Sequence, residues 1–155
     1  MKQLTIKGVL EVLNLMAECE HLMAELYRTA SRVWKEEQDF WEQTAGQEDK
    51  HAEYVLKMID LISINPEDYR PGRPLTLEAA GEFAARIREV TADLKRHAVS
   101  RHSFIKTVSD FEQKVIESNY SQIVITDNTV YKQLVKMIVA DTAGHKSAIE
   151  SLKKS

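Results

Sequence analysis

Three residues of this chain combine side-chain types and spacing that suit metal binding: Glu20, Glu48 and His51. Between residues 9 and 34, the side chains at alternating steps of four and three fall on one side of a helix, and all of them are apolar or aromatic except Glu20. Glu48 interrupts a second stripe of this kind between residues 41 and 62. Burying a lone carboxylate is costly unless it is paired or bound to a cation, so both glutamates need a partner.

His51 supplies part of the explanation, because it follows Glu48 by three residues in the run EDKHAE. Side chains three residues apart leave the same helix face one turn apart, so both can reach one ion. Carboxylate-bridged dimetal sites in helical bundles use two such Glu-x-x-His pairs and a single Glu from each of two other helices. Their oxygens balance the charge of two cations, and the imidazoles leave coordination positions open for oxygen or peroxide. The spacing alone is a weak indication, since Glu18 and His21 share it.

The second half of the chain repeats part of this pattern. Residues 20–27 read EHLMAELY and residues 112–120 read EQKVIESNY, so each has a Glu, another Glu five residues later and then a tyrosine. Glu48 lies 28 positions after Glu20, and Thr142 lies 30 positions after Glu112, with His145 three residues further on. The second half therefore keeps a single glutamate and a histidine but has a threonine where another Glu is expected. The two tyrosines are either hydrogen-bond donors or redox-active neighbours of such a site.

Helices must position these residues, and the composition favours helix almost throughout. Five glycines and three prolines occur in 155 residues, and all three prolines lie between 66 and 74. The hydrophobic period predicts an all-α fold, a single domain over residues 1–155 built as an up-down four-helix bundle. We expect bundle helices at about 5–34, 39–64, 103–124 and 129–153.

Residues 65–99, between the two halves, are expected to hold a connection and an accessory helix. The connection, SINPEDYRPGRPLT at 63–76, contains the prolines, which disfavour helix. It is longer than the short loop that antiparallel neighbours need, so we expect it to cross the bundle. Residues 77–99 should form an accessory helix across this connection, with a modest apolar face of Phe83, Ile87, Val90 and Leu94. The run TDNT at 126–129 offers N-cap residues for the last helix.

Composition narrows the classes of partner. The net charge is -3, with 21 basic and 24 acidic residues intermixed, so there is no basic stripe that would indicate nucleic acid. No run of about 18 apolar residues is free of charge, so we expect no membrane span. Cys19 is the only cysteine, which excludes an internal disulfide and fits a reducing cytoplasm. We interpret the N-terminal segment as the start of a helix, not a signal peptide.

The sequence resembles the rubrerythrin and bacterioferritin branch of the ferritin-like superfamily. The resemblance rests on AECEHLMAELYRTA at 17–30, DFWEQTAGQEDKHAEYV at 39–55 and ADTAGHKSAIESL at 140–152, and it is loose for the third bundle helix. It implies a ferritin-like four-helix bundle whose di-iron ligand positions correspond to Glu20, Glu48, His51, Glu112 and His145. Thr142 departs from the family, which carries a bridging Glu at that position.

The resemblance also implies a chemistry. Iron is the expected cofactor, as a di-iron centre or as a single iron or another divalent metal, and the reaction would be iron oxidation or the reduction of peroxide or oxygen. The Cys-rich rubredoxin module of full rubrerythrins is absent, so an electron donor, where one is needed, must be another protein. A homodimer is expected, with Trp34, Phe40 and Trp41 as candidate contacts. The alternative is a non-enzymatic bundle that acts through self-association.

The threonine at position 142 leaves three interpretations open. Asp141, four residues before His145, can swing in as a shortened substitute ligand. The site can instead hold one metal, bound mainly by Glu48, His51, Glu20 and His145. Or the metal function is lost, and hydrogen bonds and water satisfy the polar cluster. A neutral hydroxyl does not supply the charge of a bridging carboxylate, so we expect weaker or asymmetric metal binding.

Overall fold

The computed structural model describes residues 5–73, 75–118 and 120–154. Within them, five helices of 18 residues or more account for most of the chain, and sheet is confined to two strands of two residues, so the predicted all-α class is confirmed. The long helices are α1 (Ile6–Val33), α2 (Gln38–Ile64), α3 (Leu77–Lys95), α4 (Arg101–Ser118) and α6 (Thr129–Ser151). Single-turn elements connect them: η1 (Lys35–Glu37), η2 (Pro66–Asp68), α5 (Tyr120–Ile123) and η3 (Leu152–Lys154).

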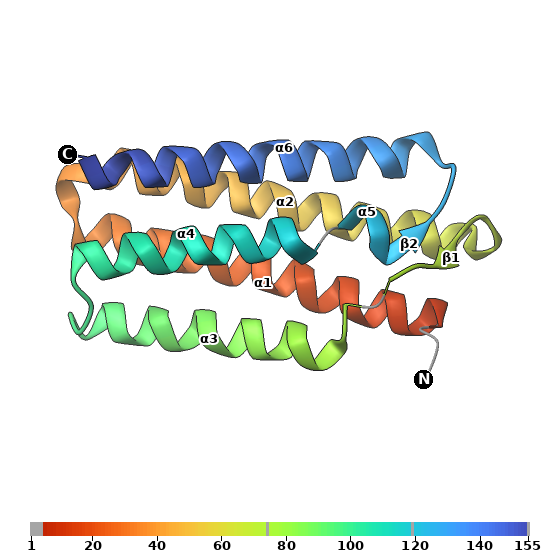
Figure 1. The fold of residues 1–155 in the computed structure, drawn as a ribbon, viewed down its shortest axis with the longest axis horizontal. Helices are drawn as coiled ribbons and strands as arrows, with labels where there is room; N and C mark the ends of the chain where they lie inside the picture. The colour runs from red at the N-terminus through yellow and green to blue at the C-terminus, as the bar shows by residue number, and fades with distance from the viewer. Residues whose placement is uncertain (1–4, 74, 119, 155) are drawn as a thin grey trace.

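The long helices lie side by side along one axis (Figure 1). The colour order in Figure 1 shows that α2 and α4 run in one direction, whereas α1, α3 and α6 run in the other. α1 packs against α2 and α3, and α6 packs against α4 and α2. The four helices α1, α2, α4 and α6 therefore surround a shared interior, and α3 covers the outer side of α1.

α3 itself forms the crossover, which corrects the prediction that it lies across a crossing loop. The connection from Asn65 to Thr76 stays at one end of the bundle, and α3 then returns along its full length (Figure 1). This return is why α2 and α4 are parallel. The predicted apolar face of α3 is confirmed, because its four members are buried: Phe83, Ile87, Val90 and Leu94.

Short polar side chains fix where several helices begin. The hydroxyl of Thr5 accepts a hydrogen bond from the Gly8 N–H at 3.0 Å and caps α1. Thr76 caps α3 in the same way, and the Asn128 side chain accepts from the Tyr131 N–H at 2.9 Å to cap α6. The cap of α6 therefore lies within the run TDNT, and it satisfies one of the backbone donors left free at a helix start.

Helix extends over most of the predicted range of 103–124 in the described residues. α4 covers Arg101–Ser118 and α5 covers Tyr120–Ile123, and β2 (Val124–Ile125) then pairs antiparallel with β1 (Arg70–Pro71). Asn119, which the helical stripe of this segment would include, lies outside the described residues. The strand pair ends the helix because it draws the backbone of 124–125 to the connection between the two halves.

Gly72 allows this connection to lie against the end of α5. The Gly72 N–H donates to the Ile123 carbonyl at 2.9 Å. A Cβ atom at this position would be 2.0 Å from the carbonyl oxygen of Gln122, so any larger residue would force the two segments apart. The connection is thereby held at one end of the bundle, away from the helix middles.

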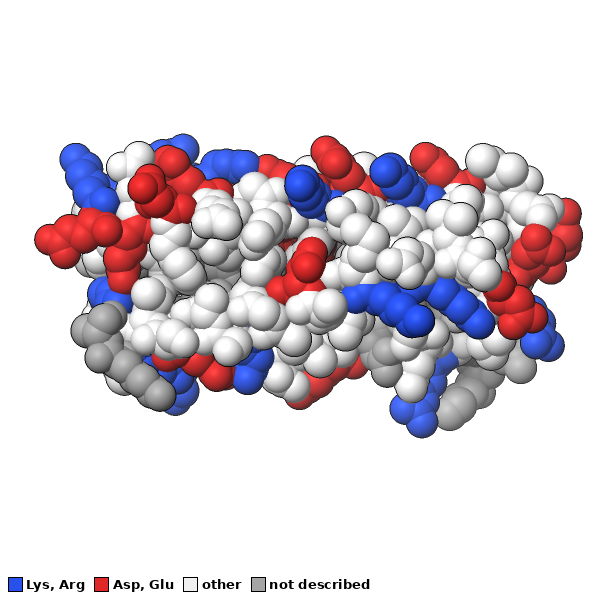
Figure 2. All heavy atoms as spheres, turned by 90° about the horizontal axis from the view of Figure 1, so that it is seen from above, with Lys and Arg blue, Asp and Glu red and all other residues white. Residues whose placement is uncertain are grey.

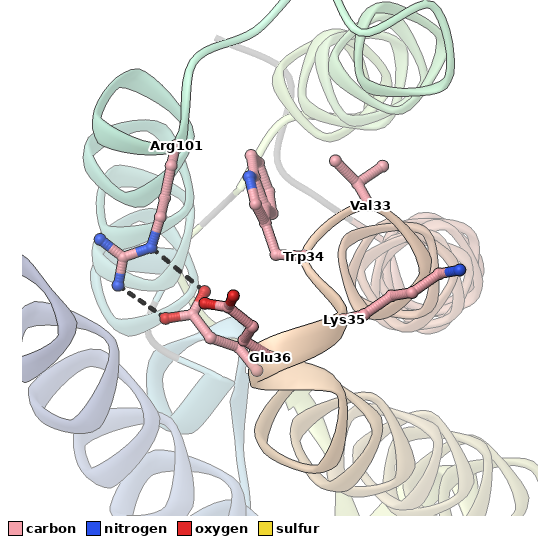
Figure 3. Close-up of a pocket in the computed structure, with 6 residues that line it drawn as sticks. Val33, Trp34, Lys35, Glu36 and Arg101 are labelled. Atoms are coloured by element: carbon pink, nitrogen blue, oxygen red, sulfur yellow. Dashed lines mark hydrogen bonds and ion pairs between the residues drawn. The ribbon is translucent and has the colours of Figure 1, made fainter.

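Aromatic side chains fill the opposite end, where α1 joins α2. Trp41 is fully buried and packs against Tyr27 and Phe104 with ring centroids 5.5 Å and 5.3 Å apart. It is therefore not available for the intermolecular contacts expected of it, whereas Trp34 and Phe40 are partly buried. Figure 3 shows the hollow at this junction, with Trp34 and Arg101 facing it from α1 and α4.

Arg101 ties the start of α4 to the turn between α1 and α2. Its guanidinium donates two hydrogen bonds to the Glu37 carboxylate, at 3.2 Å and 2.6 Å, which Figure 3 draws as dashed lines. It also donates to the Leu152 carbonyl at 3.1 Å. These contacts hold the pKa of Glu37 below its usual range, with the Arg101 hydrogen bonds as the main cause.

None of the helices in the described part of the chain has the length and apolar composition needed to cross a membrane.

The Arg101 contacts predict a stability difference between two arginine variants. Arg101→Ala should lower the free energy of unfolding by about 1 kcal/mol, because a bidentate, partly buried pair is lost. Arg86→Ala, which removes a pair whose side chains are 49% and 63% exposed, should change it by less than about 0.5 kcal/mol. Urea unfolding followed by circular dichroism measures both. Equal effects of the two substitutions would contradict the structural role of Arg101.

Candidate metal centre

Four helices bring acidic and imidazole side chains together in the middle of the bundle. α1 provides Glu20, α2 provides Glu48 and His51, α4 provides Glu112, and α6 provides His145. The first four are at most 1% exposed, and His145 is 8% exposed. Each interrupts an otherwise apolar inward face, as the sequence pattern indicates for the glutamates. The five residues that the ferritin-like resemblance selects therefore lie in one buried region.

Glu48 is at the centre of this cluster. Its Oε1 lies 3.1 Å from Nδ1 of His145, and its Oε2 lies 3.4 Å from Nδ1 of His51. One atom from each of these three residues lies within 4.8 Å of the others, a spacing that can hold a metal ion. A carboxylate that presents one oxygen to each of two imidazoles has the arrangement of a bridging ligand.

Two buried polar atoms in the cluster lack a hydrogen-bond partner among the described residues: Oε2 of Glu20 and Nδ1 of His51. They lie 3.8 Å from one another. Two ligand atoms bound to one ion at roughly 2.1 Å are separated by roughly 3.0–3.4 Å, so a small approach would bring both into contact with a shared cation. Because leaving such atoms unsatisfied in the interior is costly, this pair fits a bound metal. The residues present thus suit the group that the sequence pattern implies.

Two tyrosines connect the halves of the cluster in a reciprocal way. Tyr27, on the same helix as Glu20, donates to Oε1 of Glu112 at 2.5 Å. Tyr120, the first residue of α5, donates to Oε1 of Glu20 at 3.2 Å. Burial raises the pKa of both phenols well above the usual value, and the neighbouring carboxylates raise it further, so both hydroxyls keep their protons. Glu112 and Glu20 are thereby each held through one carboxyl oxygen.

The charges of the cluster are divided unequally among its members. Burial raises the pKa of Glu20 and of Glu112, and the adjacent Glu48 carboxylate raises both further. Burial also opposes ionisation of Glu48, but the two imidazoles outweigh this and hold its pKa well below the usual value. Burial lowers the pKa of His51, yet Glu48 and Asp141 raise it more. Without a cation, burial therefore favours the protonated forms of Glu20 and Glu112, whereas the two imidazoles favour the ionised form of Glu48.

The structure places Asp141 outside the cluster, on the other side of the His51 ring. Its Oδ2 lies 3.3 Å from Nε2 of His51, and its side chain is 52% exposed. Histidine ligands of metals commonly donate their second ring N–H to a carboxylate, which fixes the orientation of the ring. This geometry favours Asp141 as the residue that turns Nδ1 of His51 toward the glutamates, and it does not support the predicted role of a substitute ligand. Sequence spacing offered no signal for this contact between α6 and α2.

Thr142 faces the interior but contributes nothing to the cluster. It is 1% exposed, and its hydroxyl donates to the carbonyl oxygen of Ile138 at 2.7 Å on its own helix. The hydroxyl is thus satisfied one turn back along α6. The side of the cluster next to α6 consequently has an imidazole and no carboxylate from that helix.

The second Glu-x-x-His pair in the sequence is not part of this site. Glu18 is bound by Arg88, and His21 lies 3.1 Å from Asp49; both side chains are about half exposed, at 48% and 55%. The two Glu-x-x-His pairs therefore differ in burial: Glu48 and His51 lie on an inward helix face, whereas Glu18 and His21 do not.

Comparison with known proteins yields no match: no protein-family model, no curated protein and no solved structure matches this chain. The functional argument therefore depends on the cluster itself. What the geometry supports directly is a buried group of glutamate and histidine residues able to hold a metal ion.

The protonation of the cluster predicts how the metal-free protein responds to pH. For Glu20, Glu112 and His51 the folded-state pKa exceeds the unfolded one, so their stabilisation is lost as pH rises through the folded-state values. Glu48 is shifted the other way and loses its contribution only in acid. In chelator, the free energy of unfolding should therefore fall as pH rises above the unfolded glutamate pKa of about 4.3, by up to about 1.4 kcal/mol per pH unit for each titrating group.

Glu20→Gln should flatten this slope, because it removes one titrating group and keeps a hydrogen-bond donor beside Glu48. Glu82→Gln, at an exposed position of α3, serves as the matched control and should leave the slope unchanged. Denaturant unfolding at several pH values measures the effect. A metal-free protein whose stability rises over this pH range would contradict the assignment of protons.

Proposed function

We propose that this chain is a ferritin-like metal-binding protein of the rubrerythrin type, with iron as its resident metal. The observation that carries the proposal is a pair of buried atoms, Oε2 of Glu20 and Nδ1 of His51, that have no hydrogen bond within the described part of the chain and lie 3.8 Å apart beside the Glu48 carboxylate. A cation between them would satisfy both atoms and would displace the protons that the carboxyl groups otherwise hold. Mixed carboxylate and imidazole donors suit iron and its neighbours in the first transition row.

The cluster would offer two unequal metal positions that share Glu48. Glu20 and His51 would complete the first, with two carboxylates to balance the charge of the ion. His145, which lies 3.1 Å from Glu48, and Glu112 would complete the second, next to α6. Because the Thr142 hydroxyl bonds its own helix, no second bridging carboxylate is present, and the second position should bind more weakly.

The proposed reaction is oxidation of bound iron with reduction of peroxide or oxygen. Iron in this site would supply the electrons, and another protein would return them where the reaction cycles. The chain contributes a buried interior in which Tyr27 fixes Glu112 and Tyr120 fixes Glu20. Asp141 holds the His51 ring in one orientation. These fixed donors need little rearrangement when the charge of the metal changes.

Substitution of the central residues tests metal binding. Glu48→Ala and His51→Ala should each weaken binding of Fe²⁺ or Co²⁺ by more than about 100-fold, since losses in the outer shell alone cost about 10–100-fold. The exposed pair provides matched controls: Glu18→Ala and His21→Ala should leave the affinity unchanged. Elemental analysis after purification without chelator, together with calorimetric titration, measures the effect. Protein that holds no metal under these conditions would instead favour a bundle that has lost metal function.

The asymmetry of the site gives a gain-of-function test. The wild-type chain should bind Co²⁺ in two steps of different affinity, and Thr142→Glu should strengthen the second step by about tenfold or more, because it restores a carboxylate between the two positions. Thr142→Val removes the hydroxyl without adding charge and should leave both steps unchanged. Titration followed by the visible absorption of cobalt separates the steps. A Thr142→Glu variant with wild-type affinity at both steps would rule out the proposed second position.

A further inference from the structure

A hollow of about 380 Å³ lies between α2 and α6 and reaches the buried cluster. α6 lines it with Asp141, Gly144 and His145, and α2 lines the opposite side with residues that include Gln43 and Gln47. Asp141 contacts His51 and His145 contacts Glu48, so two members of the cluster lie directly behind this lining. The hollow is therefore a place where solvent approaches the otherwise enclosed glutamates.

His145 is the member of the cluster that solvent can touch. It is 8% exposed, whereas the three glutamates and His51 are at most 1% exposed. Because Nδ1 of His145 lies 3.1 Å from Glu48, a particle that reaches this imidazole is already next to the central carboxylate. His145 is thus the side chain that separates the hollow from Glu48.

Small residues keep the α6 side of the hollow open. Ala140, Gly144 and Ala148 follow one another at steps of four and therefore lie along one face of the helix. A Cβ atom added at Gly144 would meet no other atom within 4 Å, so a side chain at this position would extend into open space. A longer residue here has room to occupy the hollow without displacing the core.

The charge of the hollow suits a cation. Among the described residues, Asp141 is the one acidic residue that lines the hollow, and no lysine or arginine lines it. The side chain of Asp141 is half exposed. The two glutamines from α2 add neutral amide oxygens, which are also suitable donors to divalent ions. Figure 2 looks onto the side of the molecule that carries α6 and shows an acidic group near the middle of this face, with uncharged side chains on one side and basic side chains close by on the other. The half-exposed carboxylate of Asp141 at the mouth of the hollow favours the approach of cations.

We propose that divalent cations reach the buried cluster through this hollow between α2 and α6. Asp141 attracts the ion at the mouth, Gly144 keeps the passage open, and His145 is the first ligand that the ion meets. The proposal rests on the metal-binding function above, because a passage for cations has a purpose only if the cluster binds them. It goes beyond the proposed ligands, because it predicts that Gly144, which is not a ligand, controls the rate at which the cluster takes up metal.

Gly144→Leu tests the passage against a matched glycine control. Gly46, on α2, is also exposed and helical, and a Cβ there likewise meets no atom within 4 Å, but it does not line the hollow. Gly144→Leu should slow Co²⁺ loading of the metal-free protein, and its extraction by chelator, by about tenfold or more, because a blocked passage slows movement in both directions. The equilibrium affinity should stay within about twofold, and Gly46→Leu should load at the wild-type rate.

Chemical modification of histidine gives a readout that needs no metal. In metal-free protein, diethylpyrocarbonate should modify exposed His21 quickly, His145 more slowly and buried His51 least, as peptide mass spectrometry can measure. Gly144→Leu should protect His145 by about fivefold or more without affecting His21, because its side chain occupies the approach to the ring. Gly46→Leu should change neither rate.

The two readouts separate the possible failures. If cobalt binds but Gly144→Leu loads at the wild-type rate and leaves His145 as reactive as before, cations use another route and this inference is wrong. If His145 is protected while loading is unchanged, the hollow admits small molecules but does not carry the metal, which also overturns the inference. If the wild-type chain binds no cobalt, the proposed function fails, and the cation route fails with it.

Discussion

Three glutamate carboxyl groups share a water-excluding space in the middle of this bundle, and the rest of the structure depends on how their charge is accommodated. Glu20, Glu48 and Glu112 come from three different helices and are each 1% exposed. Like charges in such a space repel strongly, so the group must hold protons or a cation. The two histidines, from α2 and α6, stabilise the one carboxylate that ionises most readily. Function and stability are therefore opposed here, because the arrangement that suits a metal is costly without one.

The connectivity of the chain is what allows the carboxyl groups to meet. Since α3 returns along the bundle, α2 and α4 run parallel (Figure 1). The second half of the chain thereby brings Glu112 next to Glu48 of the first half. The two tyrosines then cross between halves, each fixing the glutamate of the other. The strand pair β1–β2 and Gly72 hold the intervening connection at one end, where it does not interfere with the cluster.

α6 carries Thr142 at the position that corresponds to Glu48 in the first half, and this difference between the halves has two related consequences. Thr142 offers no carboxylate to the interior, so the α6 side of the cluster carries less negative charge than the α2 side. The same helix presents Ala140, Gly144 and Ala148 to the hollow, so this side is also the more accessible one. Under the proposed function, the metal position next to this approach would suit exchange of ions with solvent, whereas Glu20 and His51 are buried.

The sequence by itself determined the helices, the inward positions of the glutamates and the pairing of Glu48 with His51, because a helical period relates residues only three or four positions apart. The repeated Glu and Tyr pattern even indicated which residues correspond in the two halves. Tertiary structure alone decided that Tyr27 bonds Glu112 across 85 positions, that Tyr120 bonds Glu20 across 100, and that Asp141 turns outward to His51. It also decided that α3 is the crossover and that residues 124–125 leave the helix for a strand. These outcomes depend on how whole helices pack and on where the chain reverses, and local periodicity contains no information about either.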